Sequence, residues 1–131
     1  MNRVEKINEA QADELRRRLP ARSKLIFWVA IETGLRISDI LRLKFKDVEN
    51  PIRVYVGRTA TVEAFPLSNE LYDELLSRMD DNNFDHYIFR SRKWKRHLHR
   101  TTYHRDIKQA IAGLDFSASA HSTRKLFLAL R

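Results

Sequence analysis

Arg36 stands between two apolar segments, where a charged side chain needs a binding partner. Residues 25–31 form an apolar run too short to cross a bilayer, and the mostly apolar residues 40–43 follow the arginine. A guanidinium at such a joint is costly unless a carboxylate or a phosphate binds it. Asp39, three residues further on, is close enough to do so. The sequence therefore allows two interpretations of Arg36, an ion pair with Asp39 that fixes a helix corner and a ligand for a phosphate.

A second group of candidate functional residues lies in the most basic run of the chain. No acidic side chain stands between His86 and Arg105, and Trp94 and Tyr103 are interleaved with the cations. This pattern predicts a surface that follows phosphates, with an aromatic ring packed against sugar or base. The alternative is a solvated loop whose aromatic side chains enter the core. The candidate DNA-binding residues are Arg90, Arg92, Lys93, Lys95, Arg96, Arg100 and Arg105, together with Lys125 from the last helix.

Three histidines in the same region, His97, His99 and His104, raise the possibility of a metal site. The sequence has no cysteine, and no carboxylate stands near them before Asp106. Since zinc sites normally combine histidine with cysteine or carboxylate ligands, no metal and no cofactor are expected.

The composition indicates one globular domain with a polyanionic partner. The 131 residues are 43% hydrophobic and 32% charged, which excludes a disordered or fibrous protein. Twenty-five Lys and Arg against 17 Asp and Glu leave a net charge of +8, which favours nucleic acid as the partner. The absence of cysteine excludes disulfides, and residues 1–6 are not followed by the apolar run of a signal peptide. A cytoplasmic protein is expected.

The pattern of apolar residues predicts a mainly helical chain with one β-hairpin. Asn8 and Gln11 resemble a capping pair, so a first helix is expected to begin there and to end at Pro20. Residues 52–56 and 61–65 read as the two strands of the hairpin. A further helix is expected after Ser38, and another after Ser68, with Leu71, Leu75 and Met79 on one face. A helix capped by Thr101 or Thr102 is expected to end at Gly113, and the last helix is expected over residues 118–131.

Two separate motifs resemble those of the tyrosine recombinases, the phage integrase family. Residues 33–43, Thr-Gly-Leu-Arg-Ile-Ser-Asp-Ile-Leu-Arg-Leu, are similar to the first arginine box of that family, and residues 120–127 are similar to its His-x-x-Arg box. Residues 43–48 and Phe-Pro-Leu at 65–67 also match habitual family sequences. The resemblance covers nearly the whole chain. It implies an α+β fold, namely a mainly helical integrase-type catalytic domain with a small antiparallel hairpin.

The resemblance also implies roles for individual residues. In the family a tyrosine hydroxyl attacks a DNA phosphodiester, forms a phosphotyrosyl bond and frees a 5′-hydroxyl. Arg36 and Arg124 would clamp the negatively charged transition state, because guanidiniums bind phosphate bidentately and keep their protons. His121 would be the general acid or base, and Asp39 would support Arg36.

The sequence departs from the family at two places. Arg58 stands where the family has a hairpin lysine that protonates the leaving oxygen, and arginine is a poor proton donor. The family's nucleophilic tyrosine follows the His-x-x-Arg helix, whereas the four tyrosines here, Tyr55, Tyr72, Tyr87 and Tyr103, all fall in other elements. The sequence therefore predicts a single domain over residues 1–131, truncated before the nucleophile and without the amino-terminal core-binding domain. We expect it to bind double-stranded DNA without cutting it.

Two other functions and one assembly property remain open at this point. The chain could be a non-catalytic DNA-binding regulator, such as a phage or plasmid repressor or accessory factor on a recombinase scaffold. It could also be a basic α+β domain that binds RNA or protein. Apolar residues of the last helix are expected to be exposed and to cause self-association or to bind a partner. These residues are Leu126, Phe127, Leu128 and Leu130.

Overall fold

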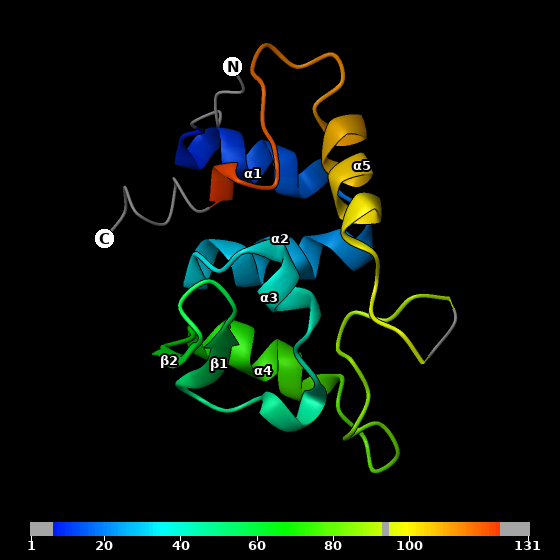
Figure 1. The fold of residues 1–131 in the computed structure, drawn as a ribbon. Helices are drawn as coiled ribbons and strands as arrows, with labels where there is room; N and C mark the ends of the chain where they lie inside the picture. Colours follow the sequence, from blue (N-terminus) through cyan, green and yellow to red (C-terminus); the bar gives the residue numbers. More distant parts are fainter. Residues whose placement is uncertain (1–6, 93–94, 124–131) are drawn as a thin grey trace.

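The computed structural model describes residues 7–92 and 95–123, which form five α-helices, a short 3₁₀ helix and a two-stranded antiparallel sheet. The elements follow one another as α1 (Glu9–Arg18), α2 (Ala21–Thr33), α3 (Ile37–Leu41), η1 (Phe45–Asp47), β1 (Ile52–Val56), β2 (Thr61–Phe65), α4 (Asn69–Ser77) and α5 (Arg100–Ala110). Figure 1 shows α2 in the middle, with α1 and α5 on one side and the hairpin and α4 on the other. The expected α+β fold is confirmed.

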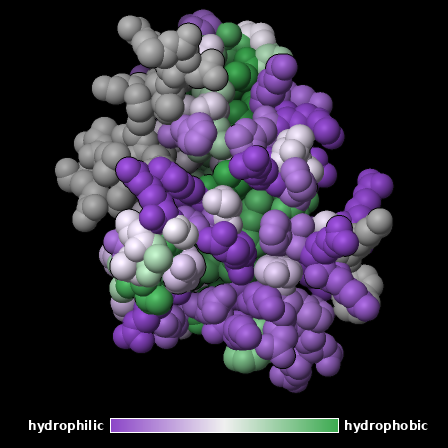
Figure 2. Space-filling view, in the orientation of Figure 1, coloured by the Kyte–Doolittle hydropathy of each residue, from purple (hydrophilic) through white to green (hydrophobic). Residues whose placement is uncertain are grey.

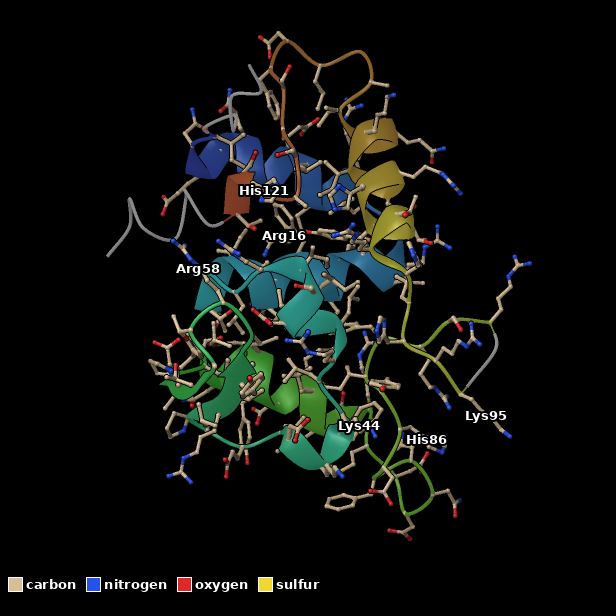
Figure 3. All side chains as sticks on the ribbon, viewed as in Figure 1. Arg16, Lys44, Arg58, His86, Lys95 and His121 are labelled. Atoms are coloured by element: carbon tan, nitrogen blue, oxygen red, sulfur yellow. The ribbon has the colours of Figure 1, made fainter. Side chains whose placement is uncertain are left out.

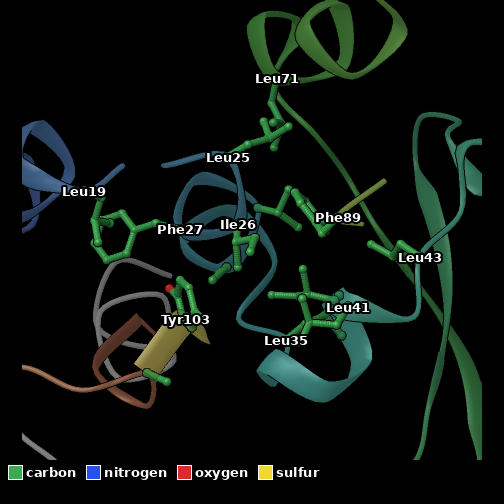
Figure 4. Close-up of a cluster of buried hydrophobic side chains, with 14 of the residues drawn as sticks. Leu19, Leu25, Ile26, Phe27, Leu35, Leu41, Leu43, Leu71, Phe89 and Tyr103 are labelled. Carbon is green, nitrogen blue, oxygen red and sulfur yellow. The ribbon is translucent and has the colours of Figure 1, made fainter. Parts of the chain in front are cut away.

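Helix α2 is the centre of the core because apolar side chains surround most of its circumference. Ile26 and Phe27 have no exposed surface, and Val29 is 1% exposed. Figure 4 shows Leu25 pointing towards Leu71 of α4 and Phe27 lying near Tyr103 of α5. A helix that is apolar nearly all round is stable only when other elements cover every side of it. Hydrophilic side chains cover most of the face seen in Figure 2.

The first helix begins as the sequence predicts. The Asn8 side chain accepts a hydrogen bond from the Gln11 amide at 2.8 Å, and the Gln11 side chain accepts one from the Asn8 amide at 3.0 Å. This reciprocal capping satisfies amide groups that a helix start otherwise leaves without partners. The helix ends at Arg18, and Pro20 precedes the first residue of α2.

The predicted hairpin has the predicted strands, with Ile52 opposite Phe65 and Val56 opposite Thr61. Asn50 closes its base: the side-chain amide donates to the Leu67 carbonyl at 3.0 Å, and the side-chain oxygen accepts from the Leu67 amide at 2.9 Å. Ile52 and Val54 are buried, whereas most of β2 is exposed. The hairpin therefore packs on the core by one face of β1, with β2 as an outer strand.

Two carboxylates join α2 to the later helices. Glu32 accepts from the amide and hydroxyl of Ser68, at 2.7 and 2.6 Å, and Ser68 caps α4. Asp106 of α5 is 3% exposed and accepts two hydrogen bonds from Arg22, at 2.8 and 2.9 Å, and one from the Ser23 hydroxyl at 2.6 Å. A buried carboxylate requires such partners.

Several predicted helix boundaries were wrong. Helix α4 ends at Ser77, so Met79 lies beyond it and is only half-buried. His99, not a threonine, caps α5 by accepting from the Thr101 amide at 3.1 Å. The last predicted helix is described only up to Thr123, and residues 124–131 lie outside the described part of the chain. Among the described residues no helix is long and apolar enough to span a membrane.

Candidate functional site

The joint between α2 and α3 is built so that Arg36 leaves the core. Gly34 ends α2 in the left-handed region, with φ 68° and ψ 11°, and its amide donates to the Ala30 carbonyl at 2.8 Å. The buried Thr33 hydroxyl donates to the Val29 carbonyl at 2.8 Å and accepts from the Leu35 amide at 3.2 Å. Glycine adopts this conformation at little cost, and the threonine satisfies backbone groups that the helix end exposes. Leu35 then enters the core, and Arg36 follows in an extended conformation.

Arg36 is exposed, contrary to the expectation that its charge would be held at a buried joint. It is the N-cap residue of α3, and Ser38, which was predicted to cap this helix, lies inside it. No hydrogen bond or ion pair joins Arg36 to any acceptor in residues 7–92 and 95–123. Its guanidinium is therefore available to an external anion as far as the described residues are concerned.

Asp39 does not pair with Arg36, so the predicted support was wrong in its partner. Asp39 is 3% exposed and accepts from the Arg42 guanidinium and, at 3.3 Å, from the Gly57 amide. Gly57 begins the turn of the hairpin, with Arg58 next in the chain. Asp39 thus fastens the hairpin turn to α3 and places Arg58 on the same scaffold as Arg36. Arg58 is exposed and points outward at the turn (Figure 3).

His121 is exposed at the start of the last described helical turn. Two serines shape this segment: the Ser119 amide donates to the Ser122 hydroxyl at 3.0 Å, and the His121 amide donates to the Ser119 hydroxyl at 3.3 Å. His104 of α5 lies near enough for their charges to interact. Partial burial lowers the pKa of His104, and the nearby His121 and Arg100 lower it further. Helix α5 in turn packs on α3, which carries Arg36.

Asp39 of α3 therefore joins the turn that carries Arg58 to the helix that begins after Arg36. Helix α5 packs on α3, and its His104 lies near His121. The predicted partner of His121, Arg124, lies outside the described residues, as does Lys125. Exposed guanidiniums and an imidazole are groups that bind a phosphodiester and exchange a proton near neutral pH. Among the described residues no cluster of three His, Cys, Asp or Glu could hold a metal ion.

The described part of the basic run is a loop as far as His99 and then the first half of α5. Short antiparallel pairing joins Arg90 to His97, and the Leu98 amide donates to the Phe89 carbonyl at 2.7 Å. Within the run, Lys93 and Trp94 lie outside the described residues, and Tyr103 is a core residue only 1% exposed, so its predicted contact with DNA was wrong. The other candidate cations, Arg90, Arg92, Lys95, Arg96, Arg100 and Arg105, are all exposed.

Sequence reasoning missed Lys44 as a member of this basic surface. Its ammonium lies 5.0 Å from the centre of the Tyr87 ring, and the His97 ring meets the same tyrosine edge-on at 5.3 Å. Lys44, Tyr87 and His97 come together because the backbones of Lys44 and Tyr87 form a short antiparallel bridge. In Figure 3, Lys44 and Lys95 lie on the lower right and Arg58 and His121 on the left. The view thus separates Lys44 and Lys95 from Arg58 and His121.

Comparisons with known proteins give the family and the fold. The model of the phage integrase family matches residues 1–129. The chain is 29% identical over 128 residues to the probable integrase/recombinase YoeC of Bacillus subtilis (strain 168), an alignment that covers 95% of this chain and 69% of the relative. The fold resembles that of lambda integrase residues 75–356 bound to DNA, with a TM-score of 0.75, 20% identity and 97% of this chain covered. It also resembles XerA recombinase, with a TM-score of 0.72, 24% identity and 97% coverage. The chain spans 50% of each of these two solved chains.

Proposed function

Because the chain belongs to the phage integrase family, we propose that it binds the phosphates of double-stranded DNA as part of the catalytic domain of a site-specific tyrosine recombinase. The observation that supports this most directly is the exposed Arg36, which has no acceptor among the described residues and follows the buried, hydrogen-bonded Thr33 and Leu35. Its guanidinium is accessible for a bidentate bond to phosphate.

The proposed chemistry assigns different tasks to the charged residues. Arg36, with Arg124, neutralises the non-bridging oxygens of the scissile phosphate while a tyrosine oxygen bonds to phosphorus and the bond to the 5′-oxygen breaks. His121 accepts the proton of the attacking hydroxyl. Arg58 holds a phosphate but is too weak an acid to protonate the leaving oxygen. The leaving oxygen therefore takes its proton from another donor, such as water.

None of the four tyrosines in the sequence is placed for this attack. Tyr103 is buried, and its hydroxyl has no hydrogen-bond partner among the described residues. Tyr55 lies on the hairpin, Tyr72 on α4 and Tyr87 beside Lys44.

We infer that these 131 residues form one catalytic-type domain that binds DNA, and that the attacking tyrosine belongs to another polypeptide segment. One solved neighbour is described as a lambda integrase tetramer bound to a Holliday junction, which supports self-association; sedimentation over a wide range of concentrations tests it.

The decisive experiment is a salt series of duplex-DNA affinities for the wild type and the Arg36→Ala variant. If Arg36 binds a phosphate, its removal weakens binding and makes the slope of log K against log salt shallower by about 1. Arg18→Ala is the matched control, because Arg18 is an exposed arginine on α1 that pairs only with Glu14 among the described residues. Equal slopes for wild type and Arg36→Ala would refute the phosphate site.

Arg58 favours one alternative, a DNA-binding regulator that kept the recombinase scaffold. A protein that only binds DNA needs phosphate ligands but no proton donor, and arginine meets that need. The regulator would protect a specific DNA site without ever forming a covalent bond to it.

A further inference from the structure

Two neighbouring hollows lie against α2. Ala21, Leu25 and Arg78 line both of them, and we call the pair the α2 trough. The larger hollow has a volume of about 350 Å³ and lies between α1, α2 and α4; the smaller has about 180 Å³ and reaches the segment after α4. Leu25 and Trp28 form the apolar floor of the larger part, and Ile88, Phe89 and Leu98 line the smaller.

The rim of the trough is cationic. Arg16, Arg17, Lys24 and Arg78 surround the larger part, and Arg22 and Arg90 surround the smaller; Glu74 is the acidic residue of the lining. Figure 3 shows Arg16 between α1 and α2. Several of these cations already pair with carboxylates, Arg16 with Asp13, Arg17 with Glu14, Arg78 with Glu74 and Arg22 with Asp106. Six cations thus face four carboxylates.

The exposed pairs on the rim are open to exchange. Surface ion pairs between long side chains contribute only about 0–1 kcal/mol, so a partner's carboxylate can replace Asp13 or Glu14 at little cost. The side-chain ammonium of Lys24 has no hydrogen bond or ion pair with any described residue. The buried Asp106 is the exception, since the Arg22 guanidinium donates a hydrogen bond to each of its two carboxylate oxygens.

We propose that the α2 trough binds an acidic amphipathic helix of a partner protein, with its apolar face on Leu25 and Trp28 and its carboxylates on the rim cations. A hydrophobic groove bordered by charges is the usual receptor for such a helix. Duplex DNA is a poorer occupant, because phosphates gain nothing from an apolar floor. A second copy of this chain does not supply the helix from its described residues. The acidic helix α4 already buries its apolar Leu71 and Leu75 in its own core.

The trough lies apart from the Arg36 joint, and of the candidate DNA-binding cations its rim shares only Arg90. Its residues on α2 are Ala21, Arg22, Lys24, Leu25 and Trp28, whereas Arg36 follows the opposite end of the helix. At 1.5 Å per residue Ala21 is roughly 18 Å from that end of α2 and Trp28 roughly 8 Å. Changes at the trough are therefore expected to leave the Arg36-dependent affinity for DNA unchanged, and this proposal can fail while the proposed function stands.

The test uses a fluorescent helical peptide of about 15 residues, the length at which isolated helices begin to persist in water. One face carries leucine and the other glutamate, and a second peptide has the same composition in scrambled order. Fluorescence anisotropy is measured with the wild type, with Ala21→Trp, which fills the shared part of the trough, and with Lys24→Glu. Lys108→Glu, an exposed position on α5, is the control for the same change of net charge. Circular dichroism confirms that each variant is folded, and duplex-DNA affinity is measured separately.

The expected result is that the wild type prefers the amphipathic peptide to the scrambled one, and that Ala21→Trp and Lys24→Glu each weaken binding by about tenfold. Lys108→Glu should bind as the wild type does. The proposal is overturned if the peptides bind equally or not at all, or if Lys24→Glu has no more effect than Lys108→Glu. Loss of duplex-DNA affinity in a folded Ala21→Trp variant would show instead that the trough binds nucleic acid.

Discussion

At the scale of single residues, Asp39 connects the two parts of the proposed phosphate site. It is a buried residue of α3, and its carboxylate binds both Arg42 and the amide that begins the hairpin turn. Asp39→Ala removes both bonds, whereas Asp39→Asn keeps an acceptor for the Gly57 amide and loses only the charge. Since a buried hydrogen bond to a charged group contributes about 1.5–3 kcal/mol, we expect Asp39→Ala to lower the free energy of unfolding by about that amount, and Asp39→Asn by less.

Urea unfolding measures these changes. Asp73→Ala, an exposed carboxylate on α4, is the matched control and should change stability by no more than about 0.5 kcal/mol. Because the turn carries Arg58, Asp39→Ala should also weaken DNA binding more than Asp39→Asn does. A cost for Asp39→Ala no greater than that for Asp73→Ala would show that the turn is held by other contacts.

The helix end just before Arg36 could be predicted from sequence, but the arrangement of the neighbours of Arg36 could not. A glycine that ends a helix leaves a recognisable pattern, and Gly34 ends α2. The partner of Asp39 was mistaken because residues three apart on either side, Arg36 and Arg42, satisfy the same spacing. Only the orientation of α3, set by packing of Ile40 and Leu41 in the core, decides between them.

At the scale of secondary-structure elements, the bond between Asp106 of α5 and Arg22 of α2 makes stability depend on pH. The hydrogen bond from Arg22 lowers the pKa of the Asp106 carboxyl, as does that from Ser23, against the opposing effect of burial. A carboxyl whose pKa is lower in the folded state stabilises the fold above its unfolded pKa, which is about 4. That stabilisation is lost as the pH falls below about 4 and passes through the folded value.

We therefore expect Arg22→Ala to be less stable than the wild type by about 1–3 kcal/mol at neutral pH and to lose less additional stability on acidification. Urea unfolding at a series of pH values from neutral to about 3 measures both effects. Arg53→Ala, an exposed arginine of β1 without an ion pair among the described residues, should keep the acid dependence of the wild type. If Arg22→Ala and the wild type lose stability in parallel, the pair does not control the acid response.

Elements with a local signal were predicted well, and elements defined by long-range packing were not. The capping pair of α1 and both strands of the hairpin follow from residues within a few positions of one another. The end of α4 and the start of α5 do not, because His99 rather than a threonine supplies the cap and Met79 falls outside the helix despite its suitable spacing. Contacts such as Lys44 with Tyr87 join residues more than forty positions apart and have no local signature.

At the scale of the whole molecule, the chain combines a cationic surface with a scaffold that matches the phage integrase family over residues 1–129. Its net charge of +8 guarantees attraction to DNA but not a specific site or a reaction. Family membership adds the fold. The proposed covalent step needs a tyrosine nucleophile as well as phosphate ligands, so the tyrosines are the residues to test.

Incubation of the chain with a nicked duplex, which traps covalent intermediates, tests this last point. We expect no adduct from the 131 residues alone, since Tyr103 is buried and Tyr55, Tyr72 and Tyr87 do not stand after the His-x-x-Arg motif, where the family has its nucleophile. Denaturing gel electrophoresis detects the adduct, and an active relative that bears its own tyrosine is the positive control. If an adduct forms, mass spectrometry identifies the tyrosine, and a nucleophile among Tyr55, Tyr72 and Tyr87 would overturn the assignment. An adduct that appears only when an Arg36→Ala relative with an intact tyrosine is added would show that this chain provides the phosphate clamp and its partner the nucleophile.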